Sequence, residues 1–309
     1  MPKTLWVHKY RPKTVDDYIF QNKNHKKLIE GYIEDQSIPN LLMSGPKGTG
    51  KTSLAYILKD YLEIPDSDFM ESNASDDTSV ENIRTKVKSF IQTIPLGDFK
   101  IVFLDEADRL SPHAQDTLKK MMEDYTESVR FILTCNKPHR IIPEIKDRCQ
   151  EIVFKGINNK DMIYKAATVL SKEGVKVDDK ELLEKYVKAS GSSLRNLIQM
   201  LEQNTHDGKL GEPMDNTGSL DALVTIATLL EDDKWEEARK TVCENITDDQ
   251  WDEVYRFLYD YLEEMGKFAK DGNKWKAGIV VIADHLYRHG IVADPEINFA
   301  ACMIRLSQI

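Results

Sequence analysis

The feature that most constrains the fold of this chain is a glycine-rich loop between a short apolar run and a helical pattern. Residues 45–52 read G-P-K-G-T-G-K-T and fit G-x-x-x-x-G-K-[ST]. The run 38–44 reads as a buried strand and 53–59 as a helix, which is the context this motif requires. Such a loop turns its backbone N–H groups toward phosphate oxygens. The residues predicted to bind the nucleotide here are Gly45, Pro46, Lys47, Gly48, Thr49, Gly50, Lys51, Thr52 and Ser53.

A second apolar run ends in acidic residues. Residues 100–108 read K-I-V-F-L-D-E-A-D, and four consecutive apolar residues predict a central parallel strand that is buried on both faces. The acids then lie at its carboxyl end, where open α/β sheets bind ligands. Thr52 and Asp105 are expected to hold Mg²⁺, and Lys51 to reach the β- and γ-phosphates of ATP. Glu106 is expected to polarise the attacking water; a GTPase more often uses Gln.

Three further polar residues follow in positions that suit a nucleotide site. Asn136 ends the apolar run 131–135, beside the end of the acidic strand and in reach of a γ-phosphate or the attacking water. Arg148 follows it by twelve residues, and an arginine finger needs a rigid guanidinium delivered from outside the nucleotide's own pocket. Arg195 opens a later helix and can lean back over the same nucleotide.

The pattern of the chain changes near residue 155. Before it, short apolar runs alternate with helical patterns, which predicts a parallel sheet with helices on both faces. After it, amphipathic helices dominate, and 204–219 is polar and glycine-rich. Predicted strands are 41–43, 69–71, 101–104, 129–134 and 151–154. Predicted helices are 24–35, 51–62, 79–93, 111–125, 160–173, 180–190, 193–203, 220–230, 235–245, 247–270, 274–289 and 295–308.

Composition and charge narrow the class of protein further. The net charge of −10 argues against a protein that coats nucleic acid with its whole surface. Residues 1–155 carry −1 and residues 156–309 carry −9, so a polyanion is expected to meet the N-terminal half, and the acidic half to assemble with proteins. The four cysteines are widely spaced, with neither a disulfide framework nor a zinc pattern. No apolar run is long enough to span a membrane and the start lacks a signal peptide, so the expected location is the cytoplasm.

Taken together, these motifs resemble one family. The phosphate loop, D-E-A-D at 105–108, Asn136, D-R-C at 147–149 and S-L-R at 193–195 follow the order found in AAA+ clamp-loader ATPases. W-V-H-K-Y-R-P at 6–12, N-A-S-D-D at 73–77 and A-Q-D-T-L-K-K-M-M-E at 114–123 are similar to segments of replication factor C small subunits. The last block is more similar to the large ATPase subunit of T4-like phage clamp loaders, at H-G-I in 289–291. The finger motif departs from the family, with Asp147 where replication factor C has Ser.

The resemblance implies a domain organisation and a division of labour between subunits. It implies an α/β AAA+ domain at 1–157, a helical lid at 158–206, a linker at 207–219 and an all-helical collar at 220–309. Lys51, Thr52, Asp105, Glu106, Asn136 and Arg195 would act in cis. Arg148 would act in trans, on ATP bound by the neighbouring subunit. Val7, Tyr10 and Arg11 would lie near the adenine, although Tyr10 reads equally well as a core anchor.

The resemblance also implies partners. Arg84 and Lys88, which lie on one helical face, and Arg109 would contact phosphates of primer–template DNA, so the duplex would be recognised by shape and not by base sequence. The helix 111–125 would meet the sliding clamp through Leu118, Met121, Met122 and Tyr125, although adjacent Met side chains cannot both face one side. The remaining partners would be copies of the chain and a different loader subunit, in a ring or spiral.

The sequence therefore predicts the ATPase subunit of a sliding-clamp loader, with ATP and Mg²⁺ as cofactors. It would lie in the host cytoplasm if encoded by a phage and in the nucleus if eukaryotic. One alternative is another AAA+ machine, such as a Holliday-junction helicase motor or a protein remodeller; the aromatic pore loop of a remodeller is missing near 73–80. A second alternative is a non-catalytic loader scaffold, which the intact set of site residues disfavours.

Overall fold

The computed structural model describes residues 4–74, 83–177, 180–206, 208–213, 226, 229, 234–246, 251–264, 272–289, 292 and 294–309. The chain forms two compact units, Met1–Pro213 and Met214–Ile309. Several sequence-based predictions lie outside the described residues, namely 75–82, most of 220–230, 290–291 and the side chain of Arg84.

A five-stranded parallel sheet forms the centre of the first unit. Its strands are β1 (Leu41–Ser44), β2 (Phe69–Asn73), β3 (Lys100–Asp105), β4 (Val129–Cys135) and β5 (Gln150–Val153). Their order is β2-β3-β4-β1-β5, so the chain crosses over between neighbours. Residues of β1, β3 and β4 are almost entirely buried, which explains their continuous apolar runs. All five predicted strands are confirmed, with ends shifted by at most two residues.

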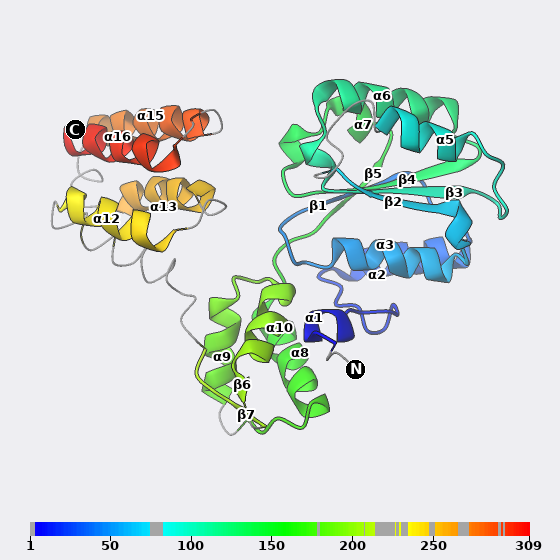
Figure 1. The fold of residues 1–309 in the computed structure, drawn as a ribbon, viewed down its shortest axis with the longest axis horizontal. Coiled ribbons are helices and arrows are strands. Elements are labelled where there is room, and N and C mark those ends of the chain that lie inside the picture. Colours follow the sequence, from blue (N-terminus) through cyan, green and yellow to red (C-terminus); the bar gives the residue numbers. More distant parts are fainter. Residues whose placement is uncertain are drawn as a thin grey trace. The chain divides into compact units, whose positions relative to one another are not determined.

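Helices cover both faces of this sheet, as Figure 1 shows. On one face lie α2 (Lys23–Glu34) and α3 (Lys51–Tyr61), which bury Ile29, Leu54 and Leu58 against the strands. On the other face lie α5 (Lys88–Ile91), α6 (Pro112–Asp124) and α7 (Pro143–Lys146). A π-helical turn, η2 (Ile83–Val87), leads into α5, where the sequence predicts one continuous helix. The α/β sandwich predicted for the N-terminal half is therefore confirmed.

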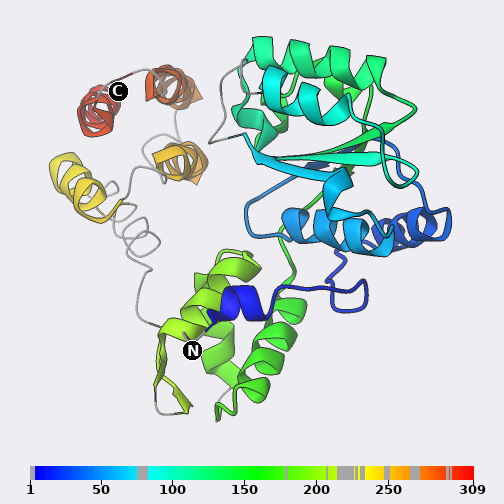
Figure 2. The ribbon, with the colours of Figure 1, turned by 45° about the vertical axis from the view of Figure 1, so that its right-hand side comes forward.

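A small helical cluster completes the first unit. Its helices are α8 (Asn159–Lys172), α9 (Lys180–Ala189) and α10 (Leu194–Gln203), each begun where predicted to within a residue. The short helix α1 (Trp6–Lys9) packs against these helices, as Figures 1 and 2 show. Trp6 and Tyr10 are buried in their core. A hairpin of β6 (Thr205–His206) and β7 (Lys209–Leu210) buries Leu210 in the same core. The start of the predicted linker thus packs on the lid.

The second unit is all-helical in its described parts. Its helices are α12 (Trp235–Asn245), α13 (Trp251–Glu264), α15 (Gly272–His289) and α16 (Pro295–Ser307). They share a core that includes Trp251, Tyr255 and Phe299. The buried Asn298 amide donates to the Tyr255 hydroxyl and to the His285 carbonyl, both at 2.9 Å, and so ties three helices together. Among the described residues, none of the helices is long and apolar enough to cross a membrane.

Candidate nucleotide site

The phosphate loop connects β1 to α3 at the carboxyl edge of the sheet. Three of its glycines have positive φ: Gly45 at 141°, Gly48 at 74° and Gly50 at 96°. Two also lie too close to a neighbour for any side chain. A Cβ on Gly45 would come 2.2 Å from the Phe154 carbonyl oxygen, and one on Gly48 would come 2.0 Å from the Ser193 hydroxyl. Glycine is therefore required both by the left-handed backbone and by the packing of strand and lid around the loop.

Lys51 begins α3 and is buried inside this loop. Its ammonium group donates to the carbonyls of Gly45 at 2.7 Å and Pro46 at 2.8 Å, and to the Asn136 amide oxygen at 3.0 Å. Burial lowers the pKa of Lys51 to about 8, and the nearby Asp105 carboxylate opposes that shift. A cation held among carbonyl oxygens at a helix N-terminus is a fitting partner for a triphosphate. The side chain of Asn136, which follows β4, thus meets the lysine of the phosphate loop.

The residues predicted to hold a metal ion lie together. The Thr52 hydroxyl donates to an Asp105 carboxylate oxygen at 3.0 Å, and the Thr134 hydroxyl of β4 donates to the other oxygen. Hydroxyl and carboxylate oxygens are ligands that Mg²⁺ accepts, with water and phosphate completing its shell. In the described residues no group of three His, Cys, Asp or Glu side chains forms a metal site. Mg²⁺ therefore fits here as a partner of a bound triphosphate, held by Thr52 and Asp105.

Glu106 follows directly, at the end of β3, in a left-handed backbone conformation. Its φ is +57°, and its N–H donates to the Thr134 hydroxyl at 3.0 Å. Non-glycine residues in this conformation are strained and cluster at functional sites. The carboxylate pairs with the Arg109 guanidinium at 2.7 Å. Sequence reasoning missed Thr134, which contacts both acidic residues, because a threonine inside an apolar strand carries no local signal of function.

Asp108, the last acid of the D-E-A-D run, has a structural role. Its carboxylate accepts the N–H groups of Asn136 at 3.1 Å and Lys137 at 3.2 Å. It is largely buried, so these bonds fix the backbone at the end of β4. Asn136 is thereby held where its side chain meets Lys51.

The lid contributes residues to the same edge. The Leu194 N–H donates to the Gly48 carbonyl at 3.2 Å, and a Cβ on Gly48 would lie 3.5 Å from the Arg195 Cβ. Arg195 therefore lies near the start of its helix, directly beside the phosphate loop. Ser193, which caps α10 by accepting the Asn196 N–H, also lies against the loop.

Of the three N-terminal residues predicted to lie near the adenine, Arg11 lies beside the phosphate loop, whereas Val7 and Tyr10 pack on the lid. The Arg11 guanidinium donates to the Ser53 hydroxyl at 3.2 Å and lies over the Tyr56 ring, 4.5 Å from its centroid, next to the loop. Tyr10 is instead buried in the lid core, where its hydroxyl donates to Glu173 at 2.7 Å. Val7 is half-buried against the same core. The core-anchor reading thus describes Tyr10 in this structure, whereas Arg11 lies at the nucleotide site.

Arg148 lies at the opposite edge of the sheet. It precedes β5, at the amino ends of the parallel strands, whereas the phosphate loop follows their carboxyl ends. Four residues of β1 separate the two edges by about 13 Å. The arrangement therefore keeps Arg148 away from its own phosphate loop.

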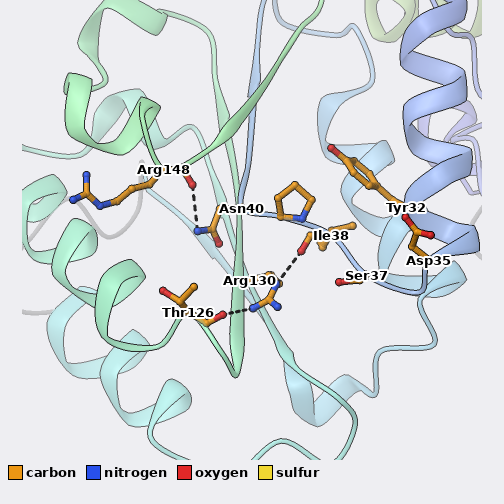
Figure 3. Close-up of a pocket in the computed structure, with 9 residues that line it drawn as sticks. Tyr32, Asp35, Ser37, Ile38, Asn40, Thr126, Arg130 and Arg148 are labelled. Atoms are coloured by element: carbon orange, nitrogen blue, oxygen red, sulfur yellow. Dashed lines mark hydrogen bonds between the residues drawn. The ribbon is translucent and has the colours of Figure 1, made fainter.

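A pocket of about 500 Å³ lies beside Arg148 at this amino edge, as Figure 3 shows. The Asn40 amide donates to the Arg148 carbonyl at 3.4 Å. The Arg130 guanidinium donates to the carbonyls of Ile38 at 2.9 Å and Val129 at 3.1 Å. Arg130 thus ties the edge of the sheet together. The guanidinium of Arg148 points away from the rest of the pocket wall.

The structure corrects the predicted clamp contacts of α6. Leu118, Met121 and Met122 are buried in the core under the sheet, and Tyr125 is half-buried against that core. The helix turns its apolar side to β3 and β4, which leaves a polar outer face. The exposed hydrophobic residues of this layer are Ile94 and Leu96, at 89% and 80% exposed, in the loop between α5 and β3.

The predicted DNA contacts have different outcomes. Lys88 is exposed at the start of α5. Arg109 is exposed but pairs with Glu106, so it lies closer to the catalytic centre than the sequence suggests. The side chain of Arg84 lies outside the described part of the chain.

The sequence is similar to one family of ATPases and to several replication proteins. Residues 41–157 match the ATPase family associated with various cellular activities (AAA). The chain is 43% identical to the replication factor C small subunit of Archaeoglobus fulgidus over 202 residues, covering 64% of this chain and 63% of that protein. It is 38% identical to that of Sulfurisphaera tokodaii over 210 residues, covering 67% and 64%. The chain thus spans a little under two thirds of these relatives' length.

Solved structures with the same fold come from Thermotoga maritima RuvB. A single-residue RuvB mutant aligns with a TM-score of 0.57 and 18% identity, over 94% of this chain and 91% of that chain. The RuvB Holliday junction branch migration motor aligns with a TM-score of 0.53 and 20% identity, over 63% and 64%. At this level of identity the likeness shows a shared fold alone.

Proposed function

We propose that this chain is the ATP-hydrolysing subunit of a DNA sliding-clamp loader, because residues 41–157 match the AAA family of ATPases and the chain is similar to replication factor C small subunits. It would assemble with copies of itself and a different loader subunit, open the clamp, place it on primer–template DNA and release it on hydrolysis. Its place of action would be the cytoplasm, that of the host for a phage protein, or the nucleus of a eukaryote.

Each cis residue has a task that follows from its position. The phosphate loop binds the triphosphate through its N–H groups, and the Lys51 ammonium leaves the carbonyls of Gly45 and Pro46 to meet the β- and γ-phosphates. Thr52 and Asp105 would hold Mg²⁺, which would supply positive charge against the triphosphate when bound. Glu106 accepts the proton of the attacking water, and the Asn136 amide orients that water or the γ-phosphate. Arg195 and Arg11 bind from the lid and the N-terminal segment.

The observation that carries the proposal is the separation of Arg148 from the phosphate loop. The two lie at opposite edges of the same short sheet, so an arginine finger on this chain acts on a neighbour's ATP. A site that is completed only by a second subunit supports an assembly in which hydrolysis depends on neighbours. A clamp loader requires such dependence, because hydrolysis, and with it the release of DNA and clamp, then follows assembly of the subunits.

The contacts with DNA and clamp are proposed at named surfaces. Lys88, Arg84 and Arg109 would hold the phosphates of the duplex, so affinity would depend on salt and not on base sequence. We place the clamp contact at the exposed Ile94 and Leu96 instead of the buried face of α6. The proposal rests on the exposure of these two large apolar side chains, which lie two residues apart in one loop.

An ATPase measurement on the assembled complex tests the proposal. The rate should rise when primed DNA and the cognate clamp are added together, and Lys51→Ala should abolish the rise. Stimulation by four-way junctions without any effect of a clamp would indicate a branch-migration motor instead. An unchanged rate in Lys51→Ala would identify this chain as a scaffold whose site is inactive.

A further inference from the structure

The Arg148 side chain is held at several points before any neighbour is present. Its Nη1 donates to the Glu144 carbonyl at 2.6 Å, and its Nη2 pairs with the Glu123 carboxylate. Its own carbonyl accepts the Asn40 amide at 3.4 Å. The guanidinium is thus fixed by two groups and the backbone by a third, although the side chain is 34% exposed.

Such fixation matters for a finger. A free arginine side chain on a surface samples many rotamers, and that freedom is lost when the guanidinium must meet a γ-phosphate. A guanidinium that is already oriented loses less, because part of the ordering has occurred before the neighbour docks. The orientation of the guanidinium before docking therefore affects the rate of hydrolysis that the finger supports.

Glu123 is itself placed on a rigid support. It lies in the last turn of α6, whose opposite side buries Met121 and Met122 in the core. The buried Gln115 amide of the same helix donates to the Arg140 carbonyl at 2.9 Å and accepts the Ile142 N–H at 2.9 Å. Gln115 therefore ties α6 to the loop that leads into α7, which carries Glu144. The two groups that hold Arg148 therefore lie on elements that the buried Gln115 connects.

We propose that Glu123 is a positioning residue for the arginine finger, which orients Arg148 toward the γ-phosphate of ATP bound by the neighbouring subunit. This inference rests on the proposed function, in which Arg148 acts in trans. Glu123 touches neither ATP nor water; it acts through the guanidinium, and it serves the active site of a different copy of the chain.

The test is the steady-state ATPase of the assembled complex with primed DNA and clamp. Glu123→Ala should lower kcat about 5- to 20-fold, the range expected when one rotamer-rich side chain loses its orientation, with little change in KM for ATP. Glu123→Gln keeps an acceptor oxygen and should retain most of the rate. Asp124→Ala is the matched control: it removes the next carboxylate of α6, which is exposed and has no bonded partner among the described residues.

Two combinations make the test specific. Adding Glu123→Ala to Arg148→Ala should lower the rate no further than Arg148→Ala alone. Mixing Glu123→Ala chains with Lys51→Ala chains should restore activity at interfaces that pair an intact phosphate loop with an intact finger. The inference is overturned if Glu123→Ala matches wild type or exceeds it, if Gln is as impaired as Ala, or if the double variant is additive. If Arg148→Ala keeps full activity, the assignment of Arg148 as an arginine finger in trans, which is part of the proposed function, is also wrong.

Discussion

At the scale of single residues, the site depends on side chains whose surroundings set their chemistry. Glu106 has a left-handed backbone, its N–H donates to the Thr134 hydroxyl, and its carboxylate pairs with Arg109. Gly48 has positive φ and touches the lid. Substitution of Glu106 or Gly48 removes little of the hydrophobic core. Variants at these two positions therefore test the function of the nucleotide site and not the stability of the core.

Glu106→Gln should leave ATP binding intact and lower kcat by about 10²- to 10⁴-fold, because an amide positions water but does not accept its proton. ATP affinity by calorimetry and single-turnover hydrolysis separate the two effects. Glu127→Gln, on an exposed turn after α6, is the control. Turnover within a few-fold of wild type would exclude Glu106 as the catalytic base.

Gly48→Ala should weaken ATP binding and lower the melting temperature, since its Cβ would lie 2.0 Å from the Ser193 hydroxyl and push the lid from the loop. Gly174→Ala separates strain from collision. It also has positive φ, at 69°, but its Cβ would have nothing within 4 Å. Gly174→Ala should cost about 1 kcal/mol of stability from backbone strain without changing ATP affinity. If Gly48→Ala and Gly174→Ala bound ATP with equal affinity, the contact between Gly48 and the lid would not contribute to ATP binding.

At the scale of elements, the apolar residues of α6 are buried in the core, whereas those of the loop before β3 are exposed to solvent. The apolar side of α6 faces β3 and β4, which makes the helix a rigid support for Gln115 and Glu123. The loop is shaped from inside by the buried Asp68, whose carboxylate accepts the N–H groups of Leu96 at 2.6 Å and Gly97 at 2.9 Å. Two apolar side chains are therefore displayed by an ordered turn.

Ile94→Ser combined with Leu96→Ser should weaken clamp binding at least tenfold while the melting temperature stays unchanged, because both side chains are already in water. Leu118→Ala gives the opposite pattern and should cost about 2–5 kcal/mol of stability, as expected for a buried leucine. Clamp binding by surface plasmon resonance and thermal denaturation measure the two effects. Unchanged clamp affinity in the serine double variant would move the clamp contact elsewhere.

At the scale of the whole molecule, the proposed function divides the active site between the two edges of the sheet. The phosphate loop, Asp105 and Glu106 lie at the carboxyl edge, and Arg148 lies at the amino edge. A head-to-tail assembly would join the two groups, because such an interface pairs different surfaces of identical subunits. Activity should then belong to interfaces and not to single chains.

Mixing Lys51→Ala chains with Arg148→Ala chains should restore part of the ATPase activity that each variant lacks alone, because some interfaces regain an intact loop and an intact finger. The finger should contribute about 10³- to 10⁵-fold to the rate. Native mass spectrometry checks that mixed assemblies form. A rate loss on Arg148→Ala in the isolated monomer, relative to the wild-type monomer, would contradict the assignment in trans.

The sequence by itself determined the features that depend on local patterns. Continuous apolar runs predicted the buried strands, and the glycine spacing at 45–50 predicted the phosphate loop, because a parallel strand and a left-handed turn each restrict the residues that they accept. The place of the acids at the end of β3 follows from the apolar run before them, whereas the place of Arg148 away from its own phosphate loop was implied only by the family resemblance.

Only the tertiary structure decided which surfaces face the core and which distant residues meet. The apolar side of α6 could bind a partner or the sheet, and packing against β3 and β4 settled this for Leu118, Met121 and Met122. Three residues acquire their roles from neighbours that are distant in sequence. Glu123 meets Arg148 at a separation of 25 residues, Thr134 meets Glu106 at 28, and Ser193 lies against Gly48 at 145. Contacts of that range leave no periodicity in a single chain, because they are made by the fold and not by local geometry.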